Sequence, residues 1–194
     1  MKKFKIKQNS GMTYVELIVV LSIFSVLSSV VIFNYGDFQA KVDIKNLASD
    51  IALKIVEAQK SSLSGAWNSS AVANWKPSYG VYFDITTPKQ FIYFADLNNS
   101  STYDAGSELL DTISITKNNY ISNIDKCSAV PCASSSNPIN LLSITFKRPD
   151  SKANFLTSPS LVFTGSDYIQ ITIQSPKAAK ALIKLYPSGR VQVN

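Results

Sequence analysis

One stretch of the chain concentrates oxygen-bearing side chains of the kind that bind hard cations. Its members are Asp96, Asn98, Ser100, Asp104 and Glu108. Their spacing, D-x-N-x-S-x-x-x-D, begins like a calcium loop, in which carboxylate and amide oxygens surround the ion. Ser101 stands where an EF-hand has glycine, and the acidic residue falls at Glu108 rather than at Ser107. Because Asp, Asn and Ser also build turns, the stretch is a candidate calcium site whose alternative is a structural turn.

The two cysteines are the second candidate for chemistry. Cys127 and Cys132 lie in C-S-A-V-P-C, where Pro131 and the flanking Ser and Asn residues predict a loop. In an oxidising compartment such a pair would form a small-loop disulfide, and two free thiols are the alternative. A metal site is disfavoured because the sequence has no histidine and no second cysteine pair.

The sequence gives little support to enzymatic activity. It has no histidine, which is the commonest general base. It has no Gly-rich phosphate loop and no Walker signature, so no nucleotide and no cofactor are expected. The basic groups Lys147, Arg148, Lys177, Lys180 and Lys184 are interpreted as solvated strand faces, with a DNA-uptake surface as the alternative.

The amino terminus carries the strongest signal. Lysines stand at positions 2, 3, 5 and 7, and an apolar run without charge extends from Leu17 to Phe33. Glu16 is the single carboxylate between Met12 and Phe33, and a charge there costs several kcal/mol unless it has a partner. As a helix this span would be ~33 Å long, enough to cross a hydrocarbon core. The lysines would hold the amino terminus in the cytoplasm.

The net charge of the chain is misleading. Of its 19 basic residues, four precede Gly11, which leaves 15 basic and 13 acidic residues and a net charge of +2 for the remainder. A nearly neutral body does not favour a nucleic-acid surface, so nucleic acid is not expected as a partner. With 45% hydrophobic residues, the chain can form a core.

The segment G-M-T-Y-V-E-L-I-V-V, Gly11 to Val20, closely resembles the class III signal of type IV pilins and type II secretion pseudopilins. The resemblance implies cleavage after Gly11 by prepilin peptidase on the cytoplasmic face, and N-methylation of Met12. It also implies that Glu16 pairs with the Met12 amino group of a neighbouring subunit. Met12 departs from the more usual phenylalanine. The implied partners are other pilin or pseudopilin subunits, the peptidase, an inner-membrane assembly platform and membrane lipid.

A long helix is expected to follow Gly11. Residues 12–35 form its transmembrane and assembly part, and residues 36–63 form an amphipathic continuation. In the second part an apolar stripe recurs at helical spacing and predicts packing on the chain's own domain. The stripe consists of Ile44, Leu47, Ile51, Ile55 and Ala58. Trp67 and Trp75 follow in a loop and are expected to cover the core, with an exposed contact site as the alternative.

Short β-branched and aromatic segments predict that residues 64–194 form an antiparallel β domain outside the cytoplasm. The expected strands are 79–83, 91–95, 109–115, 141–146, 168–173, 181–185 and 190–193. A polar loop is expected from Asn118 to Pro138. The predicted fold class is therefore α+β, with a long amino-terminal helix packed on an antiparallel β domain, as in the pilin-like fold.

A second resemblance lies further along the chain. The stretch F-A-D-L-N-N-S-S-T-Y-D-A-G-S-E-L-L, Phe94 to Leu110, looks like the strand and turn of the H-type minor pseudopilins, the GspH/FimT group. The closing S-G-R-V-Q-V, Ser188 to Val193, is similar to that group too. Together the resemblances imply a single-pass inner-membrane precursor of a structural subunit, for a pilus or a secretion pseudopilus. The alternatives are a pilus-associated binding module for DNA or a surface, and a signal-anchored extracytoplasmic enzyme.

Overall fold

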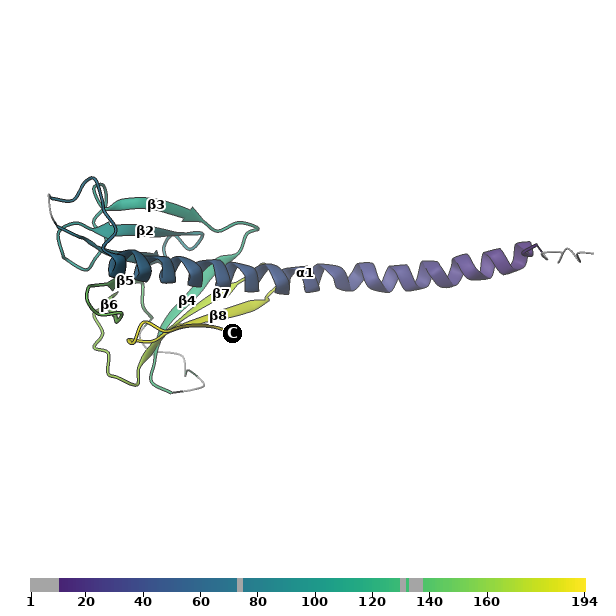
Figure 1. The fold of residues 1–194 in the computed structure, drawn as a ribbon. Coiled ribbons are helices and arrows are strands. Elements are labelled where there is room, and N and C mark those ends of the chain that lie inside the picture. Colours follow the sequence, from purple (N-terminus) through teal and green to yellow (C-terminus); the bar gives the residue numbers. More distant parts are fainter. Residues whose placement is uncertain (1–10, 73–74, 130–131, 133–137) are drawn as a thin grey trace, which may run out of the picture. The chain divides into compact units, whose positions relative to one another are not determined.

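The fold is one long helix followed by antiparallel strands (Figure 1). The computed structural model describes residues 11–72, 75–129, 132 and 138–194. The elements in order are α1 (Tyr14–Ser64), β1 (Ser78–Asp84), β2 (Gln90–Asp96), β3 (Leu109–Ser114), β4 (Tyr120–Cys127), β5 (Leu141–Phe146), β6 (Ala153–Ser158), β7 (Tyr168–Gln174), β8 (Lys180–Leu185) and β9 (Val191–Val193). The layout confirms the predicted α+β class, with a long apolar helix before antiparallel sheets.

The strands form two sheets. One has the order β3-β2-β1-β5-β6 and the other the order β4-β7-β8-β9, with antiparallel pairing throughout. The chain divides into two compact units between Gln39 and Ala40, a few residues beyond the predicted boundary at residue 36. The second unit contains both sheets and the carboxyl-terminal part of α1.

The carboxyl-terminal part of α1 supplies one side of the core. The predicted stripe is confirmed, because Ile51, Ile55 and Ala58 are fully buried and Ile44 is nearly so. Leu47 is only partly buried, whereas Ala48, which was not part of the predicted stripe, is fully buried beside it. Spacing of three and four residues puts these side chains on one face of the helix, where they pack against buried residues of both sheets.

Polar side chains of α1 fix the helix to both sheets. Gln59 donates from Nε2 to the carbonyl of Ser151, 2.8 Å away, and to that of Gly189 at 3.5 Å. Tyr93 of β2 donates to the Ser61 hydroxyl at 3.1 Å, and the buried Ser62 hydroxyl donates to the carbonyl of Phe146. These bonds join the end of the helix to strands of one sheet and to loops of both sheets, so the second unit has a single interior.

Strand β4 corrects the predicted polar loop between Asn118 and Pro138. Its buried residues Ile121 and Ile124 are three positions apart rather than two, because Ser122 forms a bulge in the pairing with β7. The bulge removes the alternation by which strands are recognised. Cys127 accordingly ends a strand and does not lie in a loop.

Two further expectations fail, and one further strand was missed. Strand β6 was not predicted; it is an edge strand that buries little more than Ala153 and Phe155. Trp67 does not cover the core, since its side chain is 75% exposed. Lys184 is not on a solvated face: it is 8% exposed, and its ammonium lies 5.5 Å from the centre of the Tyr168 ring.

A buried carboxylate fixes the loop that precedes β7. Asp167 is 3% exposed and accepts hydrogen bonds from the Thr164 amide at 2.7 Å and the Thr164 hydroxyl at 2.8 Å. All three contacts involve Oδ2 of Asp167, because the ammonium of Lys126 in β4 lies 3.1 Å from that same oxygen. The amide hydrogen bond is the main cause that lowers the pKa of Asp167 below 3.8; burial opposes it, and the Thr164 hydroxyl and Lys126 add to it.

We expect Asp167→Asn to lower the free energy of unfolding by about 1–3 kcal/mol at neutral pH, because a buried charge-assisted contact is lost. A carboxyl group whose folded pKa is depressed stabilises the protein above its unfolded pKa of 3.8, and that contribution disappears as the pH falls through the folded value. The difference between wild type and variant should therefore vanish only in the acid range below 3.8.

Urea unfolding of the full chain in non-ionic detergent, over a series of pH values, measures this difference. The control is Asp150→Asn, since the side chain of Asp150 is 68% exposed and lies 4.0 Å from Lys152. The control should change little at any pH. An equal loss in both variants would contradict a specific role for Asp167.

Candidate functional sites

The start of α1 positions the single acidic residue of the apolar segment. Thr13 precedes the helix and caps it: its hydroxyl accepts the Glu16 amide at 3.3 Å, and its carbonyl accepts the Leu17 amide at 3.1 Å. Glu16 is thus the third helical residue, in the first turn, where the helix dipole favours negative charge. Thr13 and Glu16 have the spacing of a capping box, T-x-x-E before an apolar run. This signal is present in the sequence, but it was not used to predict the start of the helix.

The amino-terminal part of α1 leaves its apolar side chains uncovered. From Met12 to Ile32, every large apolar side chain is at least 45% exposed. By length and composition, α1 is the one helix in the described part of the chain that could cross a membrane. Such an extent of exposed apolar surface must be covered by lipid or by other apolar surfaces. The predicted apolar segment of membrane-spanning length near the amino terminus is therefore present in the structure.

One face of this segment carries small polar residues. Ser25, Ser28 and Ser29 lie beside Leu21, Phe24 and Ile32 along a shallow groove. The Ser22 hydroxyl donates to the carbonyl of Val19 at 2.8 Å, which satisfies it within the helix. Small residues four apart, such as Ser25 and Ser29, allow helices to approach closely in lipid. The segment therefore has a face suited to helix packing.

The candidate calcium residues extend from Asp96, the last residue of β2, through the following loop to Glu108, just before β3. The two buried members, Asp96 and Glu108, are 0% and 1% exposed. Asp96 accepts the amides of Ser100 and Ser101, both at 3.0 Å. Glu108 accepts two more, from Leu97 and Asp104, both at 2.9 Å. Each oxygen of the two buried carboxylates therefore receives a backbone donor.

The rest of that loop is also internally bonded. Asn98 donates from its amide nitrogen to Asp104 at 2.6 Å, and Tyr103 packs on Tyr82 and Phe94. Within the described ranges, no group of three or more Asp, Glu, His or Cys side chains could hold a metal ion. Hydrogen bonding accounts for the residue types without a cation, and calcium binding stays a prediction.

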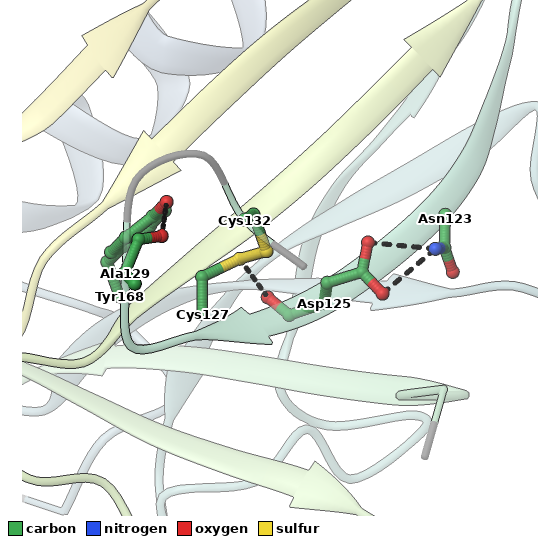
Figure 2. Close-up of a disulfide and its surroundings, with 6 residues drawn as sticks. All are labelled: Asn123, Asp125, Cys127, Ala129, Cys132 and Tyr168. Atoms are coloured by element: carbon green, nitrogen blue, oxygen red, sulfur yellow. Dashed lines mark hydrogen bonds between the residues drawn. A yellow bond between two sulfur atoms is a disulfide. The ribbon is translucent and has the colours of Figure 1, made fainter. Parts of the chain in front are cut away.

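The two cysteines form a disulfide in the structure (Figure 2). Their Cα atoms are 5.2 Å apart, within the usual range for a disulfide. Ala129, two residues after Cys127, is bonded to β7, because Tyr168 donates its hydroxyl to the carbonyl of Ala129 at 2.9 Å. Earlier in β4, the side-chain amide of Asn123 donates to both carboxylate oxygens of Asp125, at 2.9 and 2.8 Å. The disulfide thus fixes the end of β4.

The candidate processing residues lie at the edge of the described chain. Gly11 and Met12 are exposed and precede the helix. The basic residues at positions 2, 3, 5 and 7, and the rest of the predicted leader before Gly11, lie outside the described residues. Part of the predicted loop before Pro138 lies outside them too.

Comparison with known proteins returned no match: no family model, no curated protein and no solved structure is similar to this chain.

Proposed function

We propose that the chain is the precursor of a structural subunit of a pilin-type filament, in a type IV pilus or a type II secretion pseudopilus, with a pilin-like fold. One observation carries the proposal. The helix α1 has an exposed apolar amino-terminal segment with one carboxylate in its first turn, and its carboxyl-terminal part is built into the core of a β domain. Such a chain can place one end in an apolar bundle while its domain stays in water.

The apolar segment would have two successive environments. Before assembly it spans the inner membrane, with the basic leader in the cytoplasm and the β domain outside. After assembly it packs among the helices of other subunits, where the serine face allows close approach. Prepilin peptidase would cut after Gly11, and the new Met12 amino group of one subunit would meet Glu16 of the next. An inner-membrane platform with its own ATPase would supply the force.

The proposal is tested by the intact mass and amino-terminal sequence of the protein purified from membranes, with and without prepilin peptidase. We expect a chain that begins at N-methyl-Met12 only where the peptidase is present. The matched control is a Gly11→Val precursor, because a β-branched residue at the cleavage position should block processing while leaving the helix from Tyr14 unchanged. A chain that begins at Met1 in both strains would refute the proposal and leave a signal-anchored β domain.

A further inference from the structure

A groove lined by basic residues lies where α1 ends and the β domain begins. It consists of two adjoining depressions of about 320 and 260 Å³, which share Lys147 and Arg148 as a common wall. Lys152 lines one end, and Trp75, Lys76 and Asn99 line the other. We refer to Trp75, Lys76, Asn99, Lys147, Arg148 and Lys152 as the basic groove.

Three segments distant in sequence form the basic groove. Lys147, Arg148 and Lys152 lie on the connection between β5 and β6, Trp75 and Lys76 lie just before β1, and Asn99 lies in the loop after β2. The Arg148 guanidinium packs so closely on Gly65, the first residue after α1, that a Cβ atom there would be 2.4 Å from Nη1. The floor of the groove is therefore attached to the end of the helix and to the sheet.

The charge of the groove is unbalanced. Its lining has four cations and one carboxylate, that of Asp150, which lies 4.0 Å from Lys152. In the part of the chain that the structure describes, no carboxylate lies within ion-pair distance of Lys76, Lys147 or Arg148. The groove thus has a local charge of +3, whereas the chain after Gly11 has +2 in total. Clustering of this kind attracts anions regardless of a small net charge.

The groove also offers an aromatic face and amide groups. Trp75 is half-buried in its wall, so part of the indole remains accessible. Asn99 and Asn154 line opposite ends. Aromatic faces bind unstacked bases, while Lys, Arg and Asn side chains bind phosphate and sugar. A duplex keeps its bases stacked and gains nothing from the indole.

We propose that the basic groove binds a single-stranded nucleic acid, with phosphates along Lys76, Lys147, Arg148 and Lys152 and a base against Trp75. From the sequence, nucleic acid is disfavoured because the net charge is small, and a DNA-uptake surface at Lys147, Arg148 and other basic residues is the alternative; the clustering of cations in the groove favours that alternative. This inference is independent of the proposed assembly function, because it concerns the β domain and not the apolar segment of α1.

The test measures binding of a fluorescent oligothymidylate to the full chain in non-ionic detergent, by anisotropy, between about 50 and 200 mM salt. Lys147→Gln/Lys152→Gln removes two exposed cations and leaves the packed Arg148 in place. We expect affinity to fall roughly tenfold, and the slope of log K against log[salt] to become shallower by about 1.4, which is about 0.7 for each lost phosphate contact. Trp75→Ala should weaken binding about tenfold at an unchanged slope.

The matched control is Lys177→Gln/Lys180→Gln, which removes the same charge from two exposed residues, one between β7 and β8 and one at the start of β8. All variants keep the basic leader, so its contribution cancels. Equal loss in the control pair would overturn the proposal, as would a Trp75→Ala variant that binds normally. Equal affinity for a duplex, or equal competition by polyglutamate or heparin, would also overturn it, since the groove would then be a surface for acidic proteins or polysaccharides.

Discussion

Replacement of Glu16 by alanine is expected to abolish incorporation into filaments and to leave the β domain folded. In the proposed bundle the Met12 amino group of one subunit pairs with Glu16 of its neighbour, in surroundings without water. Removing one partner of such a buried pair costs about 3–5 kcal/mol. This corresponds to a loss of more than about 100-fold for each added subunit. The measurement is the fraction of the protein in sheared filaments, compared with the fraction in membranes.

A local role for Glu16 must be separated from this intersubunit role, because the residue also lies in the first turn of α1. The Thr13 cap contacts the backbone amide of Glu16, so every Glu16 variant retains it. Thr13→Ala removes the cap at a cost of about 1 kcal/mol and keeps the carboxylate. We expect Glu16→Gln to fail like Glu16→Ala, and Thr13→Ala to assemble. If Glu16→Gln assembles and Thr13→Ala does not, the role of this turn is to initiate the helix. The proposed pairing of Glu16 with the Met12 amino group of a neighbour would then be wrong. A signal-anchored enzyme would tolerate all three.

The parts of the fold that depend on local periodicity were predictable. The buried stripe of α1 follows from apolar residues three and four apart, and it was predicted except for the central place of Ala48. The strands rich in β-branched and aromatic residues, such as β1 and β7, lie within a residue or two of their predicted limits. The two missed strands give a weaker signal in the sequence. In β4 the Ser122 bulge changes the spacing, and β6 is an edge strand with three polar residues among six.

The candidate sites were predictable to different degrees. The loop from Asp96 to Glu108 was found because its oxygen-bearing residues are close in sequence. The basic groove was not predicted, because its cations come from separate segments that only the packing of the sheet on α1 brings together. Lys147 and Arg148 were noted, but their proximity to Trp75 and Lys76 is a tertiary contact with no local signal.

The largest effect on stability is expected from Gly189→Ala, at the turn between β8 and β9. Gly189 has a φ of +85°, and a Cβ atom there would lie 2.1 Å from the carbonyl oxygen of Ser151 and 2.4 Å from Nε2 of Gln59. In the same turn, the carbonyl of Pro187 accepts a hydrogen bond from the Ala153 amide, 2.9 Å away. This turn of one sheet is therefore docked on the other sheet and on α1. We expect a loss of about 3 kcal/mol or more, from backbone strain of about 1–2 kcal/mol and overpacking of about 1–3 kcal/mol.

Gly106→Ala separates strain from crowding. Gly106 has a φ of +111°, and a Cβ atom there would meet no heavy atom within 4 Å. This variant should lose only the strain contribution, about 1–2 kcal/mol. Urea unfolding of both variants in the same detergent measures the difference. If Gly189→Ala costs no more than Gly106→Ala, the segment around Ser151 moves aside freely. The contact of Gln59 with Ser151 and Gly189 would then not hold the two sheets together, and the attachment of α1 would depend on its apolar stripe and on the hydrogen bonds of Ser61 and Ser62.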